Sequence, residues 1–203
     1  NYQYKNDLNL NKSLKFGFVR GPVWNFGDED MKNGIEEFVK NTQLDIEELD
    51  LGKDFDDAAK AHEVIMNGSI ANSLMNYYQT DKSNLHPFTV KRIEAGIPVS
   101  ASDYVSAIEQ AKKMEQILKQ FFKKYDAIIT PAAPGQAPRD LMNTGNAIFN
   151  GYWTMMGVPA ISLPFLKGKD DLPIGIQFIA NWSEDLKLLE ICKYILKKEK
   201  LAD

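Results

Sequence analysis

The chain has 203 residues, 44% hydrophobic and 26% charged, an ordinary globular composition for one domain or half of a larger one. A net charge of −4 excludes the basic footprint of nucleic-acid-binding proteins, and no apolar run approaches the roughly 20 residues that a membrane span needs. The single cysteine, Cys192, excludes an intramolecular disulfide and favours a reducing compartment, so we expect a cytoplasmic protein.

The first quarter of the chain predicts a strand, a helix and a second strand. Residues 1–13 are polar and predict a loosely ordered segment, and apolar residues then alternate over 14–18 as in a strand. Asp28 is placed to cap a helix, and the run 46–51 predicts the second strand. This order predicts a βαβ unit with a right-handed crossover.

Two long helices are predicted in the middle of the chain. The first covers about 54–78 and is followed by a loop at 81–87. The second runs from 102 to 124, because Ser100 and Asp103 form a capping box at its start.

Short apolar strands alternate with loops in the last third. The strand 127–130 leads into the loop 131–143, which holds three prolines and is expected to be an exposed connection. A buried strand at 160–163 should stop at Pro164, because proline cannot donate to a central ladder. A neighbouring, antiparallel strand is expected over 173–180.

The strand 173–180 carries one polar side chain in an apolar setting. Ile174 and Phe178 belong to a face that should pack on a final helix beginning near Ser183. Gln177 belongs to the opposite face, and we expect it to be buried and hydrogen-bonded near a cleft.

The order of residues over 157–164, Gly-x-Pro-Ala-x-Ser-Leu-Pro, with Leu-Pro-x-Gly-x-Gln at 172–177, resembles the C-terminal signature of the amidase signature family. The resemblance extends upstream through Ser-Asp-Tyr at 102–104 and the run at 125–134 that ends in Pro-Ala-Ala-Pro. It implies an α/β fold, a mixed β-sheet flanked by helices. The chain, 1–203, would be a single domain forming the C-terminal part of a longer amidase-like protein.

The resemblance also implies a chemistry whose reacting groups lie elsewhere. Family members hydrolyse amides with a nucleophilic Ser, a bridging Ser at a cis peptide and a Lys base, all in their N-terminal half. This chain has no Gly-Ser-Ser-Gly-like stretch, so we assign it no catalytic residue and expect the isolated chain to be inactive. The expected partners are a small-molecule amide and the N-terminal half of the same protein.

No cofactor or metal is expected. His62 and His86 are the only histidines, they fall in unrelated elements, and with one cysteine they make a poor ligand set. Where the family often has Asn, this chain has Thr154, and it lacks the richer Asp and Thr pattern of the tRNA-dependent amidotransferase subunits. That difference favours a hydrolase over an amidotransferase.

The loop 131–143 follows a strand end, where α/β folds place ligand clefts. It is either a cleft wall or an ordinary surface connection, and the segment 146–153 is either an aromatic cleft wall or core packing. The candidate pocket residues are Thr130, Pro131, Asn150, Trp153, Thr154 and Gln177. The alternative to an amidase is a non-catalytic α/β module that binds a ligand or partner.

Overall fold

The structure is a computed structural model that describes residues 13–140 and 142–199, so the polar segment expected at 1–13 falls almost entirely outside it. Its sheet has the strand order β2-β1-β3-β5-β4. The strands are β1 (Lys15–Phe18), β2 (Asp45–Glu48), β3 (Ala127–Pro131), β4 (Ala160–Lys167) and β5 (Pro173–Ile179). The α-helices are α1 (Glu29–Asn41), α2 (Ala58–Thr80), α3 (Pro87–Gly96), α4 (Ala101–Phe121), α5 (Ile148–Met156) and α6 (Asp185–Lys198).

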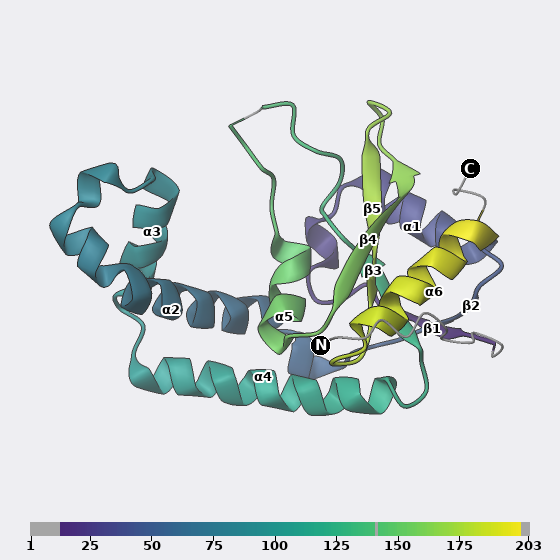
Figure 1. The fold of residues 1–203 in the computed structure, drawn as a ribbon, viewed down its shortest axis with the longest axis horizontal. Helices are drawn as coiled ribbons and strands as arrows, with labels where there is room; N and C mark the ends of the chain where they lie inside the picture. Colours follow the sequence, from purple (N-terminus) through teal and green to yellow (C-terminus); the bar gives the residue numbers. More distant parts are fainter. Residues whose placement is uncertain (1–12, 141, 200–203) are drawn as a thin grey trace, which may run out of the picture.

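The sheet is mixed and has helices on both faces, which confirms the expected α/β class. β1 pairs in parallel with β2 and β3, whereas β5 pairs antiparallel with β3 and β4. Figure 1 shows α1 and α6 on one side of the sheet and α5, with α2 and α4, on the other. Among the described residues, no helix is long and apolar enough to cross a membrane.

Local signals in the sequence start two of the helices as predicted. The Asp28 carboxylate accepts a hydrogen bond from Met31 N at 2.8 Å and caps α1. Ser100 Oγ accepts from Asp103 N at 3.0 Å and caps α4. Each cap satisfies a backbone N–H that has no partner inside the helix.

The prediction that the strand at 160–163 stops at Pro164 is wrong. β4 continues to Lys167, with a shift in its pairing to β5 between Leu163 and Leu166. Because β4 is an edge strand, the missing N–H of Pro164 leaves no ladder bond unmade. The bulge lets the strand carry the proline and resume its pairing.

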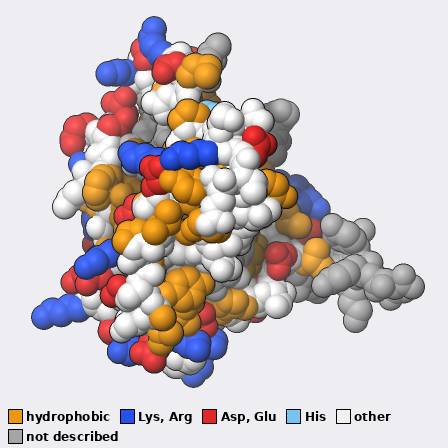
Figure 2. Space-filling view, turned by 90° about the vertical axis from the view of Figure 1, so that its left-hand side faces the viewer, with side chains coloured by type: hydrophobic (Ala, Val, Ile, Leu, Met, Phe, Trp, Pro, Cys, Tyr) orange, Lys and Arg blue, Asp and Glu red, His pale blue; other side chains and the backbone are white. Residues whose placement is uncertain are grey.

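The middle of the chain holds a helix that the sequence pattern did not predict. The expected loop at 81–87 is followed directly by α3, with Pro87 at its first position and His86 Nδ1 accepting from Phe88 N. A proline at a helix start is favourable because its missing N–H would be unpaired there. α2 and α3 form an arm that projects from the sheet (Figure 1), and apolar side chains on that side of the molecule are interrupted by charged ones (Figure 2).

Both faces of β5 are buried, as its sequence predicts for a strand inside the sheet. Ile176 and Phe178 are fully buried, and Phe178 packs edge-on against Phe165 of β4. α6 contacts β4 and β5 on the same side of the sheet. Gln177, on the other face, is only 4% exposed.

Candidate functional site

A cleft of about 750 Å³ opens beside the carboxyl end of β3. The segment 132–147 forms one wall, the start of α5 forms another, and β4 and β5 form the floor. β1 and β3 are neighbouring parallel strands. After β1 the chain continues to α1 on one face of the sheet, and after β3 it continues to α5 on the opposite face. This is the position at which open α/β sheets bind ligands, and the volume suits a small molecule.

The wall is fastened to the start of α1. Asp28 N donates to Pro134 O at 2.7 Å, in addition to the cap that the Asp28 carboxylate forms. A Cβ atom added at Gly135 would lie 1.9 Å from Asp28 Oδ2. A side chain at 135 would therefore displace the Asp28 carboxylate from its position.

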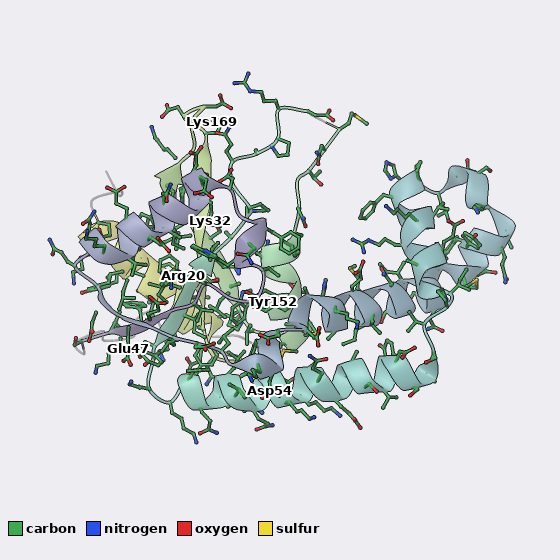
Figure 3. The ribbon with its side chains drawn as sticks, turned by 180° about the vertical axis from the view of Figure 1, so that it is seen from behind. Arg20, Lys32, Glu47, Asp54, Tyr152 and Lys169 are labelled. Carbon is green, nitrogen blue, oxygen red and sulfur yellow. The ribbon has the colours of Figure 1, made fainter. Side chains whose placement is uncertain are left out.

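A second fastening joins the wall to the turn between β4 and β5. Gln136 and Asp170 exchange hydrogen bonds, Gln136 Nε2 to the carboxylate and Asp170 N to Gln136 Oε1. The Arg139 guanidinium lies 2.7 Å from Asp170 Oδ1, and Arg139 and Gln136 lower the pKa of the Asp170 carboxyl. The turn itself, with Lys169, stands at the tip of the hairpin in Figure 3.

Two of the predicted pocket residues line the cleft. Asn150, in the first turns of α5, donates from Nδ2 to Ala132 O at 3.0 Å and so ties α5 to the wall. Gln177 lies in the floor beside Gly175 and opposite Ser162 of β4. A side chain at Gly175 would meet Ser162 Oγ at 2.1 Å, so the glycine makes room for that hydroxyl.

Four buried side-chain polar atoms lack a hydrogen-bond partner among the described residues: Thr130 Oγ1, Tyr152 OH, Trp153 Nε1 and Gln177 Nε2. The expected burial of Gln177 is thus confirmed, but the hydrogen bond expected for it is not made by its Nε2. Tyr152 belongs to α5 and is fully buried, and Figure 3 shows it in the interior of the molecule. Burial raises the pKa of its phenol far above the ordinary value, and nearby Thr130 and Trp153 offset only part of that increase.

The other four predicted pocket residues do not line the cleft. Thr130 and Pro131 are buried at the end of β3, directly before the wall begins. Trp153 is 1% exposed and belongs to the core, whereas Thr154 is exposed on α5. Of the two interpretations of 146–153, the structure favours core packing for its aromatic residues.

A second cavity, of about 410 Å³, lies next to the cleft and shares Asn146 and Ala147 with it. Its lining includes Phe26, His62 and Tyr152. Burial, together with the positive charge of Arg92, lowers the pKa of His62. The imidazole is therefore neutral at pH 7 and carries no charge into the cavity.

The arrangement offers hydrogen-bonding groups to a ligand and no evident nucleophile. Within the described part of the chain, no serine hydroxyl is hydrogen-bonded to a His or Lys side chain. Those same residues contain no group of three or more His, Cys, Asp and Glu side chains placed to hold a metal ion. Ser162 of the motif at 157–164 lines the cleft although it was not among the candidate pocket residues. Gln136 and Asn146 line it from the two segments for which the sequence left a cleft wall open.

The chain is similar in sequence to known proteins. The family model described as Amidase matches residues 2–189. A glutamyl-tRNA(Gln) amidotransferase subunit from Aliarcobacter butzleri is 34% identical over 125 residues, which are 56% of this chain and 28% of that protein. The corresponding protein from Agathobacter rectalis is 27% identical over 212 residues, 88% of this chain and 42% of that protein.

The fold is also that of solved amidase structures. An amidase crystal structure superposes with a TM-score of 0.76 at 18% sequence identity, and the match covers 89% of this chain and 44% of that one. The chain therefore spans less than half the length of each of these three proteins.

Proposed function

Because the chain belongs to the amidase family, we propose that it forms the substrate-binding half of an enzyme that cleaves carboxamide C–N bonds. The nucleophilic Ser, the bridging Ser and the Lys base would come from a segment outside this chain, the N-terminal half of the same protein. The chain's own part is to wall the cleft and orient the amide.

One observation carries this proposal: a polar cleft at the carboxyl end of β3 in a chain that offers no evident nucleophile within its described residues. The cleft is lined by the uncharged hydrogen-bonding side chains of Asn150, Ser162 and Gln177. Such groups suit a neutral, polar substrate such as an amide, and they leave the reacting groups to be supplied from across the opening.

The proposed reaction uses the cleft of this chain for binding and the reacting groups of the other segment for catalysis. The serine oxygen would attack the amide carbon while the base takes the serine proton. The base would then give that proton to the leaving nitrogen as the C–N bond breaks, which releases ammonia or an amine. Water would then hydrolyse the acyl-enzyme. Binding energy from the cleft contributes to rate only by holding the carbonyl where the serine can reach it.

The relatives named as amidotransferase subunits leave a choice about the fate of the released ammonia. In both activities the same cleavage forms an acyl-enzyme that water hydrolyses. A hydrolase releases the ammonia to solution, whereas an amidotransferase passes it to another site. The segment around Asn150 and Thr154 lacks the richer Asp and Thr pattern of the amidotransferase subunits, which favours release of ammonia to solution.

The test is ammonia release from primary carboxamides by the longest natural polypeptide that contains this chain. We expect turnover, and we expect Asn150→Leu to reduce kcat/KM because it detaches α5 from Ala132 and removes a polar group from the cleft. Full activity in that variant would contradict the placement of the substrate. Stoichiometric amide binding without turnover would instead support the non-catalytic module.

A further inference from the structure

The cleft contains a side-chain amide that the protein itself does not use. Five side-chain amides line the cleft, and four of them are engaged: Gln136 with Asp170, Asn143 with Gly145 N, Asn146 with Ile148 N, and Asn150 with Ala132 O. Within the described residues, Gln177 makes no such bond, although it is only 4% exposed and its Nε2 is fully buried.

This unpaired amide is held in place by the sheet rather than by hydrogen bonds. Gln177 pairs with Thr130 of β3 on one side and with Ser162 of β4 on the other, so its backbone position is fixed from both sides. Gly175, two residues earlier on the same face, has no side chain, and Ser162 Oγ occupies the space where its Cβ would lie. A buried amide without a partner is unfavourable, and a ligand that pairs with it removes that cost.

The chemistry of an amide edge defines the ligand. A primary amide presents a carbonyl oxygen and, on the same side, an N–H, so two such edges pair through two hydrogen bonds. A trans secondary amide has its N–H on the opposite side and makes only one of these bonds. A tertiary amide can only accept.

Resting on the function proposed above, we infer that Gln177 is the specificity-determining residue of the cleft and that it pairs edge to edge with a primary carboxamide. Its N–H donates to the substrate carbonyl, and its Oε1 accepts from the syn N–H of the substrate nitrogen. Rotation of the terminal amide by half a turn exchanges Oε1 and Nε2 with little change in shape, so either edge orientation is available. The enzyme therefore selects primary carboxamides over N-substituted ones.

A structural role for Gln177 and a role reserved for a ligand predict different effects of Gln177→Met on stability. If the amide were needed by the fold, Gln177→Met would lower the thermal midpoint. If it is reserved for a ligand, replacing it with an apolar side chain of similar length leaves the midpoint unchanged or raises it. Gln120→Met, an exposed position on α4, is the matched control.

The experiment is a titration of residues 1–203 with benzamide, N-methylbenzamide and N,N-dimethylbenzamide, followed by ¹H–¹⁵N NMR. We expect benzamide to bind most tightly and to shift the side-chain NH₂ signal of Gln177, which is identified by its absence in Gln177→Met. In that variant the benzamide Kd should rise about tenfold, because two hydrogen bonds are lost, while the Kd of the dimethyl compound, which only accepts one bond from Gln177, should rise less.

Two results are distinguishable failures. Equal benzamide affinity in Gln177→Met and in the unaltered chain overturns the role of Gln177 but leaves an amide-binding cleft. No binding of any benzamide to the unaltered chain overturns the proposed function of the cleft as well. If Gln177→Met does not fold, the fold itself needs the amide, and the role of Gln177 as an amide reserved for a ligand is overturned.

Discussion

Gly135 lies so close to Asp28 that alanine at position 135 should destabilise the protein by breaking the N-cap of α1. A Cβ atom at 135 would lie 1.9 Å from Asp28 Oδ2 and 2.5 Å from its Cγ, so the carboxylate must turn away. That movement removes its 2.8 Å hydrogen bond from Met31 N. The backbone at 135 is not in the left-handed region, so alanine is not strained there for its own sake.

The size of the effect follows from the cap. Losing an Asp N-cap costs about 0.5–2 kcal/mol, typically about 1 kcal/mol. Gly→Ala at a compatible backbone position otherwise stabilises by about 0.4–1 kcal/mol through the unfolded chain. We therefore expect Gly135→Ala to cost up to about 0.6 kcal/mol with Asp28 present at the typical value of the cap, and to stabilise by about 0.4–1 kcal/mol in an Asp28→Ala background.

The assay is a double-mutant cycle of urea unfolding followed by circular dichroism. The coupling between the two substitutions should be about 1 kcal/mol, because they act on one hydrogen bond. Additive effects, with Gly135→Ala equally costly in both backgrounds, would refute the argument that Gly135 acts by making room for the cap.

Three further predictions concern other parts of the molecule. Burial raises the pKa of Cys192 to about 12, so the native protein should not react with a thiol reagent at pH 8, whereas the protein unfolded in urea should react. Rapid labelling of the native protein would contradict the burial of Cys192 in the core. The pKa of His62 is lowered in the folded state, so the unfolded chain binds a proton at His62 before the folded chain does as the pH falls, and the free energy of unfolding decreases. His62→Gln should reduce this decrease between pH 7 and pH 5, and an unchanged decrease would contradict the argument. The chain alone should release no ammonia from primary carboxamides, whereas turnover that a serine substitution within 1–203 abolishes would show that the nucleophile lies inside it.

Local rules in the sequence predict much of the fold. The Asp28 and Ser100 caps act over three residues, so the sequence alone is enough to locate them. The fate of Pro164 depends on β4 being an edge strand, which is decided by pairing between segments far apart in the chain. α3 was missed because its signal, a proline at the first position, is equally typical of a loop.

In the candidate site, too, residues with a local signal could be predicted from the sequence, and contacts between distant segments could not. Gln177 stands out in the sequence because a polar side chain inside an apolar strand must be explained, and Asn150 lies near a motif. Trp153 and Thr154 were chosen from the same segment, but helical geometry turns one into the core and the other to solvent. Gln136 and Asp170 meet across 34 residues of sequence, and no local pattern signals that contact.

The central claim is that the cleft beside β3 is where this chain holds an amide. The most direct measurement is a crystal structure of residues 1–203 soaked with a primary carboxamide. We predict density for the amide between Asn150 and Gln177, with its nitrogen and oxygen facing the Gln177 side chain. The carboxamide lying instead in the groove between α2, α3 and α4, near Ser69 and Ile97, with the cleft empty, would contradict the claim.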